Sequence, residues 1–329
     1  MSVNLKRVLV PTTLVAAGWD VLRGRDDVVT ATYVPFMPTA EFRALLAEID
    51  GIALSVTPFG AADVEAAARL QVVARMGVGY DAVDVPALTR RGVPLMVVGI
   101  ANSVTVAELA IFHMMTLSKR GPTMRRIVEE SRWGDKFAER PTELYEKTLL
   151  IVGFGRIGTR VARRCLAMEM TVLVHDPYVS AETIQAAGCA KVEDLDLALP
   201  RADIVTLHCP KTKETTGLIG AARLARMKRS AILINTARGG IVDEAALYEA
   251  LTEATIAAAA LDVYATEPAP AGNPLFALPN ISLSPHIGGG TVEAGDRAAI
   301  ACVKNILSVF DGTPIRENVV NPEVLSGRR

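Results

Sequence analysis

The sequence predicts an α/β protein with two domains, each built on a doubly wound parallel sheet that carries helices on both faces. Three observations lead to this fold class. The chain has 329 residues, which is enough for two domains of ordinary size. Half of the residues are hydrophobic and the formal net charge is −1, so the chain can bury a large core. Short β-branched runs alternate with Ala-rich helical segments, as in parallel βαβ units.

The first third of the chain contains the expected strands of one sheet. They are Arg7–Val10, Val28–Thr32, Gly51–Leu54, Gln71–Ala74 and Val93–Val97, with helices expected at Ala61–Leu70 and Val85–Arg91. A charged start followed by an apolar run imitates a signal peptide. Pro11 and the two threonines after it interrupt that run at once, so we expect a first buried strand instead.

The middle of the chain repeats the alternation more regularly. The expected strands are Thr148–Val152, Thr171–His175, Asp203–His208, Ala231–Asn235, Ile256–Leu261 and Asn280–Leu283. Six such strands with helices between them complete a second doubly wound sheet.

Two long helices are expected outside these runs. Ala101–Arg120 carries apolar residues on most of its surface, which predicts a largely buried helix. Arg297–Phe310 is followed by Asp-Gly-Thr-Pro at 311–314, a typical helix stop. We expect this last helix to return to the first domain. The first domain is then discontinuous, and two chain crossings form a hinge.

Composition excludes several classes of partner. The 35 Lys and Arg residues balance 36 Asp and Glu residues, which argues against a nucleic-acid binder. No apolar run approaches the roughly 18 residues of a membrane helix, so no membrane partner is expected. The cysteines Cys165, Cys189, Cys209 and Cys302 are far apart and form no CxxC pair. We therefore expect no disulfide framework, no metal site and a cytoplasmic location.

A glycine motif stands at the start of the second sheet. Gly153, Gly155 and Gly158 form G-x-G-x-x-G between the strand Thr148–Val152 and the helical run Arg160–Met168. Gly153 permits a tight turn, Gly155 lets the backbone approach a pyrophosphate, and Gly158 lets helix and strand pack closely. The first N–H groups of the helix then face the phosphates. The alternative is a Gly-rich turn with a purely structural role.

Asp176 at the end of the next strand completes this motif. Its carboxylate can accept hydrogen bonds from the adenosine ribose hydroxyls and would repel a 2′-phosphate. No Arg follows within residues 177–180. The sequence therefore predicts NAD, rather than NADP, as the cofactor.

Four histidines are the candidates for proton transfer. His113 lies inside a helix and is expected to be a packing residue. His175 precedes the ribose-binding Asp, and His208 ends a strand that passes the cofactor, so neither is expected to transfer protons. His286 lies in the glycine-rich segment 284–290 after the last strand. Ligands of α/β sheets bind outside these strand ends, so His286 is the candidate acid/base, the alternative being an ordinary loop histidine.

Charged residues at neighbouring strand ends support this choice. Glu267 follows one strand and can reach the imidazole of His286, where a negative charge favours imidazolium. Arg238 follows another strand and precedes two glycines, and its planar guanidinium suits bidentate binding of a carboxylate. Each alone could belong to a structural ion pair. Asp262 suits either a turn cap or a hydrogen bond to a nicotinamide carboxamide.

Longer motifs extend over most of the chain. They are Arg-Met-Gly-Val-Gly-Tyr-Asp at 75–81, Val-Ala-Glu at 106–108, Asn235 to Asp243, Asp262 to Pro268, and Pro285 to Gly289. In this order they resemble the D-isomer-specific 2-hydroxyacid dehydrogenases, and the phosphoglycerate dehydrogenase-like branch in particular.

The resemblance implies roles for individual residues. Arg238 binds the substrate carboxylate, His286 is the acid/base, and Glu267 pairs with it. Backbone N–H groups near Val78 and Gly79 hold the carboxylate from the other domain. Further substrate contacts are implied at Ser55 and Arg75, and cofactor contacts at Gly153, Gly155, Arg156, Ile157, Gly158, Asp176, Cys209, Thr236, Asp262, Gly288 and Gly289.

The resemblance also implies an organisation. Residues 1–101 plus 291–329 form a discontinuous, flavodoxin-like substrate-binding domain, and residues 102–290 form a Rossmann NAD-binding domain. A homodimer is implied, with the helix from Asn102 to Arg120 and the arm after it in the interface. The sequence ends at Arg329, so the additional regulatory domains of some relatives are expected to be absent.

The expected activity is hydride transfer between NAD and C2 of a D-2-hydroxy or 2-oxo acid, with a 3-phosphoglycerate- or hydroxypyruvate-like substrate as one option. Relatives that use phosphoglycerate often carry Arg before Ser at the end of the third strand, whereas Leu54 precedes Ser55 here. Two alternatives stay open. One is a formate dehydrogenase-like enzyme, against which the Glu267 and His286 pair argues. The other is an NAD-sensing corepressor-like scaffold, which retains similar residues.

Overall fold

The computed structural model describes residues 5–138 and 140–326. The ends of the predicted first domain, residues 1–4 and 327–329, lie outside these ranges. The chain divides into two compact units: unit 1 is Met1–Asn102 with Gly289–Arg329, and unit 2 is Ser103–Gly288. The chain therefore passes between the units twice. The first crossing, after Asn102, lies one residue later than the expected boundary after residue 101, and the second, after Gly288, lies two residues earlier than the expected boundary after residue 290.

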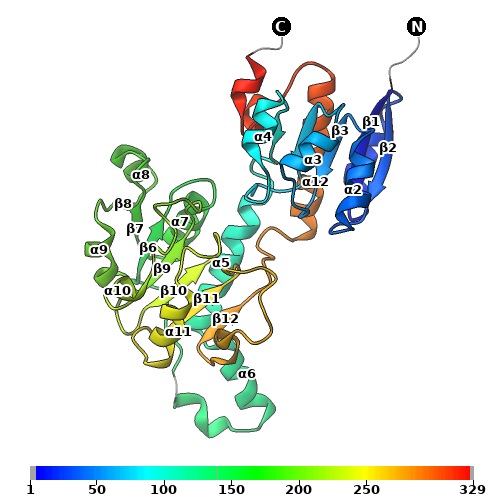
Figure 1. The fold of residues 1–329 in the computed structure, drawn as a ribbon. Helices are drawn as coiled ribbons and strands as arrows, with labels where there is room; N and C mark the ends of the chain where they lie inside the picture. The colour runs from blue at the N-terminus through cyan, green and yellow to red at the C-terminus, as the bar shows by residue number, and fades with distance from the viewer. Residues whose placement is uncertain (1–4, 139, 327–329) are drawn as a thin grey trace. The chain divides into compact units, whose positions relative to one another are not determined.

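Unit 1 contains a five-stranded parallel sheet in the order β2-β1-β3-β4-β5 (Figure 1). Its strands are β1 Lys6–Pro11, β2 Val28–Tyr33, β3 Gly51–Leu54, β4 Val72–Arg75 and β5 Leu95–Met96. This is the flavodoxin-like strand order. The strands stay parallel, but the order in which the chain adds them reverses between β1 and β3. The loops after these two strands therefore flank the position where such sheets bind ligands.

Helices cover both faces of the unit 1 sheet. They are α1 Ala16–Arg23, α2 Thr39–Leu46, α3 Ala61–Ala66, α4 Val85–Arg90 and α12 Val292–Phe310, followed by short 3-10 turns at Arg316–Asn318 and Pro322–Leu325. Successive strand residues point to opposite faces. Val8 and Val10 therefore pack in a core with α1 and α12, whereas Leu9 packs with α2 on the other face. This explains why β1 reads as a continuous apolar run.

Unit 2 contains a seven-stranded parallel sheet in the order β12-β11-β10-β9-β6-β7-β8 (Figure 1). Its strands are β6 Thr148–Val152, β7 Thr171–His175, β8 Ala190–Lys191, β9 Ile204–Leu207, β10 Ile232–Asn235, β11 Ala258–Leu261 and β12 Ile281–Leu283. The expectation of six strands was wrong by one. The edge strand β8 spans two residues without a β-branched side chain, so its sequence carries no strand pattern.

The unit 2 sheet is covered in the same way. Its helices are α5 Ser103–Ser118, α6 Gly121–Glu129, α7 Gly158–Ala167, α8 Ala181–Ala186, α9 Leu195–Ala198, α10 Ala221–Leu224 and α11 Glu244–Thr252, with 3-10 turns at Trp133–Phe137, Leu199–Arg201 and Pro274–Ala277. One face packs with α9, α10 and α11. The other packs with α5, α7 and α8. A fully buried aliphatic side chain in such a core contributes about 1.5–3 kcal/mol.

Several helix boundaries differ from the expected ones. The expected helix at 61–70 ends at Ala66, because Ala67 leaves the helical conformation with φ −90° and ψ 68°. The last helix begins at Val292, since Thr291 caps it by accepting a hydrogen bond from the N–H of Ala294. The expected helix at 101–120 is α5, Ser103–Ser118. Arg120, in the left-handed conformation, separates it from α6, which begins at Gly121.

Within residues 5–138 and 140–326, none of the helices is both long and apolar enough to cross a bilayer. All four cysteines lie in the described ranges and carry free thiols.

Candidate active site

The glycine loop after β6 is shaped by close backbone contacts. Gly153 has φ +95°, and a Cβ there would lie 2.6 Å from the backbone N of Cys209. A Cβ on Gly158 would lie 2.2 Å from the carbonyl O of Gly153. Neither position can carry a side chain without moving the backbone. Gly155, in contrast, has nothing within 4 Å of its Cβ position, so the loop leaves open space just before α7 begins.

Asp176 is fixed at the end of β7 by two backbone donors. Its Oδ2 accepts a hydrogen bond from the N–H of Phe154 at 2.7 Å, and its Oδ1 accepts one from the N–H of Tyr178 at 2.9 Å. The carboxylate therefore joins the glycine loop to the next strand end. Each oxygen keeps a further lone pair for another donor, so this geometry is compatible with ribose binding.

Two buried polar atoms lie at the ends of β9 and β10. Within the described part of the chain, His208 Nδ1 and Thr236 Oγ1 are buried and have no hydrogen-bond partner. His208 Nε2 lies 3.0 Å from Thr206 Oγ1, and burial lowers the pKa of His208 to about 3. Because buried polar atoms are normally satisfied, these two fit a site that a polar cofactor completes. Burial also raises the pKa of the neighbouring Cys209 to about 11, so its thiol is neutral.

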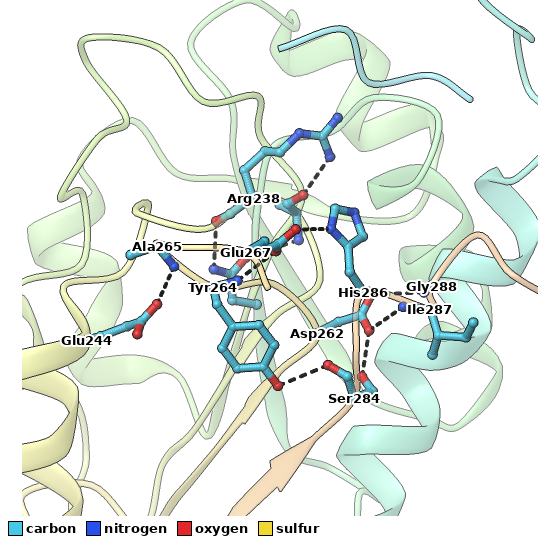
Figure 2. A network of polar contacts seen from close by, with 12 residues as sticks. Arg238, Glu244, Asp262, Tyr264, Ala265, Glu267, Ser284, His286, Ile287 and Gly288 are labelled. Atoms are coloured by element: carbon cyan, nitrogen blue, oxygen red, sulfur yellow. Dashed lines mark hydrogen bonds and ion pairs between the residues drawn. The ribbon is translucent and has the colours of Figure 1, made fainter. Parts of the chain in front are cut away.

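His286 and Glu267 form the central pair of the site (Figure 2). Nδ1 of His286 lies 2.6 Å from Oε2 of Glu267, and Oε1 of Glu267 accepts a hydrogen bond from the N–H of Tyr264 at 2.9 Å. The carboxylate requires a hydrogen on Nδ1, so a neutral imidazole keeps Nε2 as its acceptor. The two side chains are 48% and 34% exposed, so the pair orients the ring more than it stabilises the fold.

The turn that carries His286 is held by Asp262 (Figure 2). His286 has φ +53°, a left-handed conformation that costs a non-glycine residue about 1–2 kcal/mol. Its N–H donates to the carbonyl O of Asp262 at 2.8 Å. The carboxylate of Asp262 accepts hydrogen bonds from the N–H groups of Ile287 and Gly288, each at 2.9 Å. Asp262 therefore acts as a turn clamp, while its predicted cofactor contact stays a prediction.

Arg238 lies in a loop that Asn235 and Gly239 shape. Asn235 Oδ1 accepts a hydrogen bond from the N–H of Ala237, and Asn235 Nδ2 donates to the carbonyl O of Arg238. A Cβ on Gly239 would lie 1.7 Å from the carbonyl O of Tyr264, so this loop packs directly on the loop that carries Glu267. Nη1 of Arg238 donates to the carbonyl O of Ala237 at 2.7 Å, which fixes one edge of the guanidinium.

The substrate-binding candidates of unit 1 lie at carboxyl ends of its strands. Arg75 Nε donates to the carbonyl O of Gly79 at 2.8 Å, which folds the loop after β4 around the guanidinium. Over the described residues, the N–H groups of Val78 and Gly79 find no acceptor in the chain. Ser55 is differently engaged, since its N–H donates to the hydroxyl of Tyr33 at 2.9 Å. Gly289, assigned to the cofactor by resemblance, belongs to this unit.

The other histidines have structural partners. His175 Nδ1 lies 3.2 Å from the carbonyl O of Val192, and His113 is fully buried with hydroxyl partners at both ring nitrogens.

Sequence reasoning missed two residues that shape the site. Glu244, the first residue of α11, accepts a short hydrogen bond from the N–H of Ala265. Ser284 donates to Asp262. Position next to a motif was the only signal for either residue.

Comparison with known proteins identifies the family of this site. Residues 111–288 match the sequence profile described as "D-isomer specific 2-hydroxyacid dehydrogenase, NAD binding domain". The match covers β6 to β12, and with them the glycine loop and the pair of His286 with Glu267.

Individual relatives agree with this match. The chain is 42% identical over 270 residues to a D-3-phosphoglycerate dehydrogenase of Archaeoglobus fulgidus, which covers 82% of this chain and 51% of that protein. It is 39% identical to a glyoxylate reductase of Korarchaeum cryptofilum, covering 84% of each chain. Among solved structures, D-lactate dehydrogenase of Aquifex aeolicus, complexed with NAD and lactic acid, superposes with a TM-score of 0.84 at 27% identity, covering 95% of this chain and 99% of that one.

The lengths of these relatives differ. The chain spans about half of the first D-3-phosphoglycerate dehydrogenase but most of the glyoxylate reductase. The profile match, the relatives and the two parallel sheets agree with each other, and the chain belongs to the D-isomer specific 2-hydroxyacid dehydrogenase family.

Proposed function

We propose that the protein is an NAD-dependent oxidoreductase that transfers hydride between NAD and C2 of a D-2-hydroxy acid or the corresponding 2-oxo acid. The observation that carries this proposal is the contact of 2.6 Å between His286 Nδ1 and Glu267 Oε2. The loop of Glu267 packs against the loop that carries Arg238. An oriented acid/base beside a carboxylate-binding guanidinium is what oxidation of a hydroxy acid requires.

The cofactor is held, in this proposal, along the strand ends of unit 2. The open loop at Gly155 and the first N–H groups of α7, with Arg156 and Ile157, bind the pyrophosphate. Asp176 binds the adenosine ribose, and the unpartnered Thr236 Oγ1 supports a polar contact further along the sheet. Bound NAD supplies the hydride acceptor for oxidation, and NADH supplies the donor for reduction.

The protein side chains provide proton transfer and orientation. Nε2 of His286 removes the hydroxyl proton during oxidation and returns one during reduction, while Glu267 keeps Nδ1 protonated and stabilises the imidazolium. Arg238 binds the substrate carboxylate and fixes C2 for the reaction. In unit 1, the proposal assigns substrate contacts to Ser55, to Arg75 and to the N–H groups of Val78 and Gly79.

The substrate side chain is proposed to lack a phosphate. The residue before Ser55 is Leu54, whose apolar side chain is completely buried. This position therefore offers no cation to a substrate phosphate. Arg75, which the proposal keeps as a substrate contact, donates hydrogen bonds to the carbonyl groups of Gly79 and Leu54. The curated relatives nevertheless include phosphoglycerate dehydrogenases, so phosphorylated substrates must be assayed directly.

One panel of 2-oxo acids tests the proposed function. NADH consumption is measured with glyoxylate, pyruvate, hydroxypyruvate, 4-methyl-2-oxopentanoate and 3-phosphohydroxypyruvate, and NAD⁺ reduction is measured with formate. Turnover of an unphosphorylated 2-oxo acid at ordinary enzyme rates of roughly 1–10³ s⁻¹ supports the proposal. A preference for formate would assign the formate dehydrogenase activity instead. Binding of NADH without any turnover would indicate a cofactor-sensing scaffold.

Asp176 is expected to select NAD over NADP, because its carboxylate repels a 2′-phosphate. In the variant Asp176→Ala, the ratio of kcat/KM for NADH to kcat/KM for NADPH should be lower than in the unaltered protein. Asp194→Ala is a matched control, since Asp194 also accepts two backbone N–H groups but caps α9. Equal use of both cofactors by the unaltered protein would contradict the assignment of Asp176.

We also propose a homodimer that uses α5 and the segment after it. Large apolar side chains in this region are exposed, among them Phe112, Val128, Trp133 and Phe137, which are between 55% and 65% exposed. Such residues rarely gather on a monomer surface without a partner. Sedimentation equilibrium should give twice the mass of the chain, and Phe112→Asp should shift it toward monomer. A monomer at micromolar concentration would contradict this proposal.

A cytoplasmic location is proposed as well, and four free thiols support it. Fractionation of the source cells tests it, and recovery from an oxidising compartment would overturn it.

A further inference from the structure

A chain of polar side chains joins α5 to the ends of β11 and β12, with its histidine and its aspartate buried and its two serines half-buried. His113, on α5, is completely buried. Its Nδ1 lies 2.9 Å from Ser282 Oγ, and its Nε2 lies 3.1 Å from Ser284 Oγ. Ser284 Oγ in turn lies 2.7 Å from Oδ1 of Asp262. The catalytic roles discussed above do not involve His113.

Each hydrogen in this chain can be assigned. Asp262 accepts backbone N–H groups at both carboxylate oxygens, so it acts as an acceptor and Ser284 donates its single hydroxyl hydrogen to it. Ser284 Oγ must then accept from His113, which places a hydrogen on Nε2. Nδ1 of the neutral ring accepts from the hydroxyl of Ser282. Burial lowers the pKa of His113, in agreement with a neutral ring, and the negative charge of Asp262 opposes this shift only in part.

The chain ends on the turn that carries His286. Asp262 holds this turn through the N–H groups of His286, Ile287 and Gly288 (Figure 2). A Cβ on Gly288 would lie 2.8 Å from Oδ2 of Asp262 and 3.4 Å from Cδ2 of Leu109 on α5. The turn is therefore packed on the same helix that carries His113, and a small rotation of Asp262 would displace it.

We propose that His113 is a positioning residue for the acid/base: as the neutral Nε2–H tautomer, it directs the Ser284 hydroxyl onto Asp262 and thereby fixes the turn that carries His286. Its effect on turnover rests on the proposed function. The tautomer and the hydrogen-bond chain do not depend on it, because they concern the protein alone.

The tautomer is tested first, by nitrogen NMR of the imidazole rings. The chain has only four histidines, and the His113→Gln variant identifies the signal of His113. We expect hydrogen on Nε2 and none on Nδ1, and no protonation of this ring at neutral pH. A hydrogen on Nδ1, or an imidazolium at neutral pH, would overturn the proposal whatever the enzyme turns over.

Kinetics test the positioning role. His113→Leu removes both hydrogen bonds at similar volume, and it should lower kcat about 2- to 12-fold, which is what one hydrogen bond is worth, with little change in KM for the 2-oxo acid. His113→Gln keeps an amide N–H donor and should recover most of the loss. Met114→Leu changes a fully buried neighbour on α5 without touching the polar chain, so it controls for packing and should keep the kcat of the unaltered protein.

A double-mutant cycle tests whether His113 acts through Ser284. Ser284→Ala should reproduce the loss of His113→Leu, and the double variant should be little worse than either single variant. Additive losses, or an unchanged kcat in a folded His113→Leu protein, would contradict the positioning role. Faster hydrogen exchange at the amides of Ile287 and Gly288 in these variants gives a readout that needs no activity. If the unaltered protein reduces no 2-oxo acid, the proposed function fails, and NMR and exchange still decide the role of His113.

Discussion

His286→Ala is expected to lower kcat by about 10²- to 10⁴-fold, the usual contribution of general acid–base catalysis. The carboxylate of Glu267 lies 2.6 Å from Nδ1 of this imidazole. Nε2, on the other side of the ring, is therefore the atom that can accept the substrate proton. Binding of NADH should persist, because the ring contributes no part of the glycine loop. Steady-state kinetics and NADH fluorescence titration measure the two effects separately. Near-normal kcat in this variant would remove His286 from the mechanism.

Glu267→Gln tests the pair in a second way. The oxygen of the glutamine amide can still accept the hydrogen on Nδ1, but the amide carries no charge to stabilise the imidazolium that forms when His286 takes the hydroxyl proton. A hydrogen bond to a charged group is worth about 1.5–3 kcal/mol, so kcat for oxidation of the 2-hydroxy acid should fall by about 10- to 150-fold. Glu249→Gln, on the exposed surface of α11, should leave kcat unaltered.

The double variant decides whether the two residues act together. When two groups form one catalytic unit, removing both costs little more than removing the more important one. His286→Ala with Glu267→Gln should thus resemble His286→Ala alone. An unaltered kcat in Glu267→Gln, or additive losses in the double variant, would show that the contact between them has no part in catalysis.

Arg238→Lys is expected to be far from conservative. The guanidinium presents a planar fork of donors, and a lysine ammonium cannot reproduce its bidentate contact with a carboxylate. A hydrogen bond to a charged group is worth about 1.5–3 kcal/mol, which predicts a fall in kcat/KM of about 10- to 150-fold. The hydrogen bonds of Asn235 hold the backbone of this loop, so the loop should stay in place.

The control for this substitution lies at the other end of the same strand. Arg229→Lys changes an exposed residue just before β10 and should leave kcat/KM unaltered. NADH binding should survive in both variants. Wild-type turnover by Arg238→Lys would show that another group anchors the substrate carboxylate.

The central strands β3 and β6 could be predicted because they are buried on both faces. β3 and β6 match their expected bounds, since an uninterrupted apolar run of a parallel strand is visible without any tertiary information. β8 could not be predicted, because a two-residue edge strand is defined only by its pairing with β7. Tertiary contacts that the local sequence does not show also explain why α3 ends early, at Ala66. Ala67 and Leu70 favour a helix locally, but both are buried in the core of unit 1.

The site divides in the same way. Arg238, Glu267 and His286 carry recognisable chemistry at strand ends, so the sequence singled them out. The structure adds what holds them, and this depends on contacts between distant positions. His113 and Ser284 are 171 positions apart in the sequence, and no local pattern predicts their hydrogen bond. The sequence also could not show why residue 288 is a glycine. A side chain there would collide with Asp262 and press on α5.

The discontinuity of unit 1 has a consequence for synthesis on the ribosome. The strands β1 to β5 are made first, and α2, α3 and α4 can cover one face of their sheet at once. Val8 and Val10 on the other face pack with α1 and α12. Helix α1 is made together with the sheet, but α12 is translated only after the whole of unit 2, Ser103–Gly288. The part of this apolar surface that α12 covers therefore stays exposed while unit 2 is synthesised, at roughly 5–20 residues per second. Unit 2, continuous in sequence, can fold during this delay, whereas the nascent unit 1 is the part that we expect chaperones to protect.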